Sequence, residues 1–134
     1  MAVAQPRVSY SEGDTLSVRN DEATTLSKGM IVKRGTSQDG ALLFDAVTDD
    51  ILGVVMNDIP AGKWGAVQRG GRAAVLLGAT IAPGDRLMPH ATNGKAIAWT
   101  ASAGNNAAVL GNANSAGADG DLAEVDLAIA VRQG

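Results

Sequence analysis

Glycine recurs along the whole chain, and this spacing limits what the sequence can fold into more than any other feature. Seventeen of the 134 residues are glycine, and most gaps between them are too short for a helix of average length. A glycine inside a helix costs about 1 kcal/mol relative to alanine. The sequence therefore predicts an all-β fold, with a single helical turn possible only at Asp21–Lys28.

Short runs between the glycines are typical of strands. In the last run, Val125, Leu127 and Ile129 fall on one face, and Glu124 and Asp126 fall on the other. Short strands separated by turns predict a small barrel or sandwich. The expected strands are Asp14–Arg19, Met30–Arg34, Ala41–Val47, Ile51–Asn57, Lys63–Arg69, Arg72–Gly78, Asp85–Pro89, Lys95–Thr100, Ala107–Asn112 and Leu122–Val131.

An internal repeat organises these strands. Two sets of residues share spacings of nine and then five positions: Gly53, Gly62 and Val67, and Gly111, Gly120 and Val125. We therefore predict one β-barrel domain over residues 21–134, built from two related halves at 26–69 and 81–127 that close on each other. The segment 70–80 would link them as a further strand, and residues 1–20 would form an N-terminal arm and first strand. Chance agreement in a glycine-rich chain is the alternative.

Composition excludes several kinds of chemistry. The chain has no cysteine, and His90 is its single histidine, so disulfides, thiol nucleophiles and multi-histidine metal sites are ruled out. The net charge of −3 is the wrong balance for a nucleic-acid binder. The longest apolar run, 73–82, is too short to span a bilayer. The N-terminal residues 1–7 contain no apolar segment typical of a secretory signal, so we expect an intracellular or virion setting.

The acidic side chains offer the best alternative to a purely structural reading. Three pairs could supply general acid and base groups, Asp49 with Asp50, Asp119 with Asp121, and Glu124 with Asp126, but they fall in or beside glycine-rich turns. A calcium loop could draw on Asn112, Asn114, Asp119 and Asp121, although EF-hand spacing fails because its twelfth position would be Ala123. We interpret the carboxylates and the turn residue His90 as solvated, and expect no enzyme, metal or cofactor.

Contact surfaces are the remaining candidates. Lys63, Arg69 and Arg72 cluster in sequence around Gly70 and Gly71, which suggests a hairpin turn with exposed basic residues, or else a patch for an acidic protein partner. Trp64 alone is no stacking platform for nucleic acid. We expect Trp64, Trp99, Arg69 and Arg72 to serve as core or oligomer contacts. We expect the turn-rich residues 103–119 to face solvent.

The N-terminal arm is the first choice for a partner interface. Pro6 excludes a helix there, and Val8 and Tyr10 would share one face of an extended strand. Such a segment can add a strand to the edge of a neighbouring sheet. We therefore predict that Arg7, Val8 and Tyr10 contact a partner protein, with a frayed terminus as the alternative.

The ordered motifs resemble a family of tailed-phage capsid cement, or head decoration, proteins. The residues that carry the resemblance are Glu12–Val18, Leu26–Val32, Ile51–Val55 followed by Ile59–Gly62, Gly84–Leu87, and Val109–Gly111. Together they cover nearly the whole chain, in the family's order.

The resemblance implies a small tulip-like β-barrel that stands as a homotrimer on the outer surface of a phage shell. It implies contact with the major capsid protein where capsid subunits meet, and no catalytic residue. Another virion module, such as a tail, spike or fibre-base component, is the alternative function. A small metal-binding or hydrolytic domain is the third.

Overall fold

The fold is all-β, as predicted. The computed structural model describes residues 15–35, 38–44, 51–90, 94–99 and 106–133, without side-chain detail at 106–108 and 130–133. Each expected strand run overlaps one strand. The strands are β1 Thr15–Asn20, β2 Ile31–Arg34, β3 Gly40–Leu43, β4 Gly53–Val55, β5 Trp64–Gln68, β6 Gly71–Leu76, β7 Arg86–Pro89, β8 Ala96–Ala98, β9 Asn106–Ala113 and β10 Leu122–Gln133.

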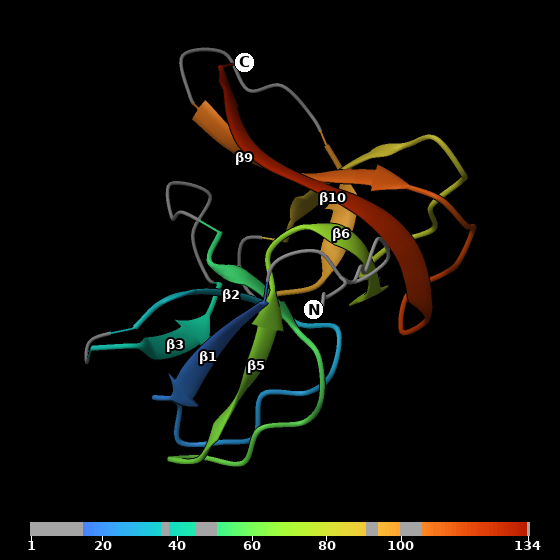
Figure 1. The fold of residues 1–134 in the computed structure, drawn as a ribbon. Coiled ribbons are helices and arrows are strands. Elements are labelled where there is room, and N and C mark those ends of the chain that lie inside the picture. The colour runs from blue at the N-terminus through green and yellow to red at the C-terminus, as the bar shows by residue number, and fades with distance from the viewer. Residues whose placement is uncertain (1–14, 36–37, 45–50, 91–93, 100–105, 134) are drawn as a thin grey trace, which may run out of the picture.

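The strands form two five-stranded units that follow one another along the chain (Figure 1). The first unit is a closed barrel in the order β1-β3-β2-β4-β5, and the second is a sheet in the order β6-β10-β9-β7-β8. In each unit the first strand pairs antiparallel with the last, β1 with β5 and β6 with β10. Each half therefore builds its own unit, and β6 is the first strand of the second unit as well as the link between the two.

Backbone hydrogen bonds outside the ladders recur at matching places in the two units. Gly29 N–H donates to Val55 O at 2.9 Å, and Gly84 N–H donates to Ala113 O at 2.8 Å. The isolated bridge between Leu26 and Ile59 likewise recurs between Ile81 and Gly117. The repeating unit extends further towards the N-terminus than the glycine spacing predicts, because it includes β1 and β6.

Four glycine turns explain the regular spacing. Gly29, Gly62, Gly84 and Gly120 have φ between 74° and 92°. In each turn the next residue donates its N–H to a carbonyl three positions back, as Met30 does to Ser27. This is the geometry of a type II turn, whose third position needs positive φ.

The possible helical turn at 21–28 is wrong, and no helix occurs anywhere in the described ranges. Asn20 accepts the Glu22 N–H through Oδ1 at 2.7 Å, and Leu26 forms a β-bridge with Ile59. These contacts hold the segment extended before the turn at Gly29.

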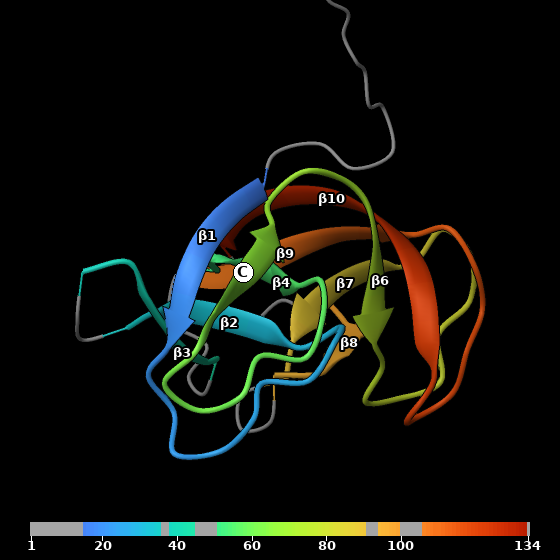
Figure 2. The ribbon, with the colours of Figure 1, turned by 60° about the horizontal axis from the view of Figure 1, so that its bottom comes forward.

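The units differ in how the first strand meets the third. In the first unit, Arg19 N–H donates to Asp39 O at 2.8 Å and closes the barrel. At the matching place in the second unit, Leu76 N–H donates to Gly29 O and Gly94 O accepts from Ile31 N–H. The backbone of residues 29–31 therefore bonds to Leu76 at the end of β6 and to Gly94 just before β8 (Figure 2). Directly beyond this place Leu77 and Ala96 pair in a parallel bridge, so the second unit uses both its own strands and part of the first unit here.

The core is divided in the same unequal way. One cluster fills the first barrel: Val18, Leu26, Val32, Ala41, Leu52, Val55, Ile59 and Val67. The other belongs mainly to the second unit but also takes Ile31, Phe44, Ile51 and Val54 from the first. The apolar face of the second sheet is therefore covered by side chains from the outside of the first barrel.

The expectation that residues 103–119 face solvent is wrong for much of that segment. β9 occupies 106–113, and Val109, Leu110 and Ala113 on it are buried. This strand runs between β7 and β10, so it must be packed on the core. Its Asn and Gly residues hid this role in the sequence, because both are also typical of turns.

Candidate functional site

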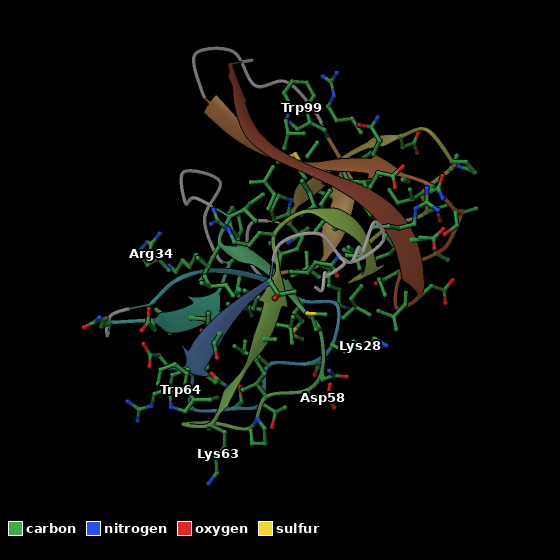
Figure 3. All side chains as sticks on the ribbon, in the orientation of Figure 1. Lys28, Arg34, Asp58, Lys63, Trp64 and Trp99 are labelled. Carbon is green, nitrogen blue, oxygen red and sulfur yellow. The ribbon has the colours of Figure 1, made fainter. Side chains whose placement is uncertain are left out.

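Trp64 is the most exposed large apolar side chain among the described residues, at 58%. It begins β5, directly opposite Arg19 on β1. The next residue, Gly65, lies against Ile59, since a Cβ at Gly65 would be 2.5 Å from Ile59 Cγ1. Side chains alternate along a strand, so Trp64 points outwards, near Lys63 at the end of the first unit (Figure 3).

The same position in the second unit is Leu122, which begins β10 opposite Leu76. Leu122 is 48% exposed but packs on Gly29 of the first unit. The contact is so close that a Cβ added to Gly29 would lie only 2.6 Å from Leu122 Cδ2. Trp64 is therefore not a core residue. Its predicted role as an oligomer contact remains a prediction.

Trp99 lies near the opposite end of the molecule (Figure 3). It follows β8 and donates its backbone N–H to Arg86 O at 2.7 Å, and the Arg86 guanidinium lies 5.5 Å from its ring centroid. Phe44 holds the matching position in the first unit, bonded to Ile31 O, and is fully buried. Trp99 is half-buried, and its Nε1 is a buried donor with no partner in the described part of the chain.

Arg72 binds two of the carboxylates that could have served acid and base chemistry. Its Nε donates to Asp126 Oδ1 at 2.9 Å, and Nη1 lies 3.8 Å from Glu124 Oε1. The hydrogen bond to Asp126 and the two negative charges raise the pKa of Arg72 above its ordinary value. All three side chains are about half exposed. This geometry is typical of a surface ion-pair network across β6 and β10.

The basic residues do not form one patch. Lys63 lies at the start of β5 and Arg69 just beyond its end, which separates them by about 20 Å at 3.3 Å per residue. Arg69 is exposed. The interpretation of a turn with exposed basic residues therefore fits Arg69 and Arg72 but not Lys63.

Gln68 holds the crossover between the two units. The side chain is buried, and Nε2 donates to Gly70 O and Arg72 O, both at 2.9 Å. Replacing Gln68 by alanine leaves two carbonyls without this donor, so we expect a loss of about 2 kcal/mol in the free energy of unfolding. Urea titration would measure it. Arg69→Ala, at the exposed next position, is the matched control and should change stability by less than about 0.5 kcal/mol; equal losses would refute this role of Gln68.

A cleft of about 200 Å³ opens beside this crossover, with Lys28, Met56, Gln68, Arg72 and Ala74 in its lining. Its apolar walls and the charge of Lys28 suit an acidic or amphipathic side chain of a partner, whereas the charge of Arg72 is already paired with Asp126 and Glu124. Sequence reasoning missed it, because its walls come from both units and no spacing pattern connects them.

The other candidates stay apart. His90 closes the hairpin after β7 by donating its backbone N–H to Lys95 O, Asp119 pairs with Lys95 at 3.5 Å, and Asp121 Oδ2 accepts from Ala118 N–H at 2.9 Å. No cluster of three or more acidic or histidine side chains suited to a metal occurs in the described ranges. Arg7, Val8, Tyr10, Asp49 and Asp50 lie outside those ranges.

Fold and surface together define a tandem of two related five-stranded β units with an exposed tryptophan on the first. The described residues include no helix that is long and apolar enough to cross a membrane. No family model matches the chain, and no curated protein matches it.

Among solved structures, the chain is similar to the N-terminal base of the head fibre protein gp8.5 of bacteriophage phi29. The TM-score is 0.63 at 18% identity, and the likeness covers 86% of this chain and 93% of that chain. The two proteins therefore share a fold.

Proposed function

We propose that this protein is a structural component of a phage particle, most specifically the base of a fibre or spike on the head surface. The observation that carries the proposal is the extent of the likeness to the phi29 head fibre base, 86% of this chain and 93% of that chain. Coverage this wide includes both units, so the shared feature is the tandem arrangement and not a single generic barrel.

A capsid decoration protein is the second candidate, favoured by the ordered motifs that resemble that family. Two of them contain Gly29 and Gly84, which form the matched type II turns of the two units. Either role would place the protein on the outside of the shell, against the major capsid protein, as a homotrimer without enzymatic chemistry, nucleic-acid or membrane partners.

Repetition is the physical basis for either role. One small β protein buries modest area on a shell, but several copies joined together bind with much higher avidity than one. The N-terminal arm predicted from the sequence, with Arg7, Val8 and Tyr10, would add a strand to the edge of a neighbouring sheet. The exposed Trp64 and the cationic cleft supply side-chain contacts of the kinds enriched at protein interfaces.

Phage heads that lack the protein provide the test. Purified protein is mixed with such heads, and bound copies are counted after sedimentation and located by cryo-microscopy. We expect saturable binding at fixed positions on the shell exterior. Absence of binding, or density only on the tail, would refute attachment to the head.

The same experiment separates the two roles. A fibre base carries further protein density outwards from its distal face, whereas a decoration protein ends there and raises the temperature at which heads disrupt. Removing residues 1–10 should lower occupancy on the shell without changing the unfolding midpoint of the free protein. Unchanged occupancy would remove the arm from the interface.

A further inference from the structure

The contact between the two units joins a glycine turn on one unit to a pair of strand residues on the other, which we call the receiving surface. Each unit contains both a turn and a receiving surface. The turn around Gly29 on the first unit packs against Leu76 and Leu122 on the second. Leu76 N–H donates to Gly29 O at 2.9 Å. The Leu122 side chain packs on Gly29, since a Cβ added there would lie 2.6 Å from Leu122 Cδ2. This contact runs head to tail, because the two units contribute different surfaces to it.

The second unit carries the same turn without a receiving partner in the described part of the chain. Gly84 has φ 91°, against 88° for Gly29, and its N–H makes the matching bond to Ala113 O. Ala82, Pro83 and Gly84 are exposed. A Cβ at Gly84 would meet nothing within 4 Å, whereas one at Gly29 would meet Leu122 and Leu76.

The first unit carries the matching receiving surface. Arg19 and Trp64 are opposite one another on β1 and β5, as Leu76 and Leu122 are on β6 and β10. Both side chains are exposed. On the second unit the two equivalent positions cover the Gly29 turn, whereas on the first unit they face outwards.

The chemistry of this second pair differs in a way that suits contact between separately folded molecules. Two leucines receive the Gly29 turn, but an arginine and a tryptophan occupy the free surface, and these two residue types are enriched at interfaces and their hot spots. Asp85 in the free turn accepts the Ala82 N–H through Oδ2 at 2.9 Å, and its other carboxylate oxygen would face Arg19 of a docked copy. Pro83 would offer an apolar face to Trp64. Arg19 N–H already bonds to Asp39 O, so the docking would use side chains and would not open the barrel.

We propose that a second copy of this chain docks its turn 81–85 on the surface formed by Arg19 and Trp64, so that copies associate head to tail. This proposal specifies the contact that would form the homotrimer of the proposed function. It rests on the self-association in that proposed function, but not on attachment to a shell. A repeated head-to-tail contact closes into a ring when its rotation allows, as in a trimer.

Cross-linking between single-cysteine variants tests the orientation, since the natural chain has no cysteine. Ser17→Cys lies two residues from Arg19 on β1, on the same face as Arg19 and Trp64, and Ala82→Cys lies in the free turn; both sites are exposed. The two variants, one carrying an affinity tag, are mixed and treated with a short bismaleimide. Ala128→Cys, exposed on β10, replaces Ala82→Cys in the matched control.

We expect the mixed product of Ser17→Cys and Ala82→Cys to exceed both the Ser17→Cys homodimer and the Ala128→Cys control severalfold. Adding Trp64→Ala or, separately, Arg19→Glu should remove the excess while circular dichroism stays that of a folded protein. A dominant Ser17→Cys homodimer would mean a two-fold interface and would overturn the proposal. Equal yields with Ala128→Cys, or no excess at the highest soluble concentration, would also overturn it. Shell binding takes no part in this assay, so its failure is distinct from failure of the head-attachment test.

Discussion

Gly29→Ala should lower the free energy of unfolding by about 4 kcal/mol, which places it among the most damaging single substitutions. Gly29 has φ 88°, where a residue with a Cβ pays about 1–2 kcal/mol. The added Cβ would also lie 2.8 Å from Leu76 N and 2.6 Å from Leu122 Cδ2. Leu76 N is backbone and donates to Gly29 O, so the two units must move apart.

Gly84→Ala is the control, because it makes the same change at the matched turn. Its φ is 91° and nothing lies within 4 Å of the added Cβ, so only the backbone strain of about 1–2 kcal/mol should appear. Urea unfolding of both variants would measure the difference. Equal losses would show that the contact of residues 29–31 with Leu76 and Gly94 contributes little to stability.

Asn20→Ala should lower the free energy of unfolding by about 3 kcal/mol, because it leaves several buried backbone groups unpaired. Asn20 is buried at the end of β1, where Nδ2 donates to Thr24 O at 2.8 Å and Ile59 O at 2.7 Å. Its Oδ1 accepts from Glu22 N–H at 2.7 Å. One side chain thus fixes the segment that leads from β1 into the Gly29 turn.

Thr24→Ala is the control for Asn20, since it keeps the backbone carbonyl that Asn20 binds and changes only an exposed side chain. It should stay within about 0.5 kcal/mol of the natural protein. Thermal unfolding followed by circular dichroism would compare the two. A loss below about 1 kcal/mol for Asn20→Ala would mean that water replaces the amide without penalty.

The two units show how a repeated fold takes on separate tasks. The second unit has Leu77, buried in its core, where the first has Asn20, and the second has Leu122 where the first has Trp64. The first unit closes on itself and needs a polar clamp at its exit. In the second unit the first and third strands meet only in the bridge between Leu77 and Ala96, and residues 29–31 of the first unit bond to Leu76 and Gly94 beside it.

Local pattern was enough to place the strands. Alternation in β10 and the glycines with positive φ that end each run reflect interactions within a few residues, so they can be read without knowing the fold. β9 was located as a strand but assigned to a solvent-facing loop segment, because its burial depends on β7 and β10 lying on either side of it. The turn-like composition of that segment gave no sign of these neighbours.

The contact surfaces were much less accessible to sequence reasoning. Lys63 and Arg69 are close in the chain but lie at opposite ends of β5, whereas Trp64 and Arg19 are distant in the chain and directly opposed. The cleft at the crossover draws its walls from both units. A pattern within one strand cannot report which distant strand lies beside it.

The sequence by itself determined the β class, the strand positions and the turns at glycines, because each depends on short-range geometry. Only the tertiary structure decided that each half is its own five-stranded unit and that residues 29–31 complete the second. The physical reason is that the closing of a sheet depends on hydrogen bonds between residues far apart in the chain. Gly29 and Gly84 form the same local turn, but only Gly29 has residues of the other unit packed against it.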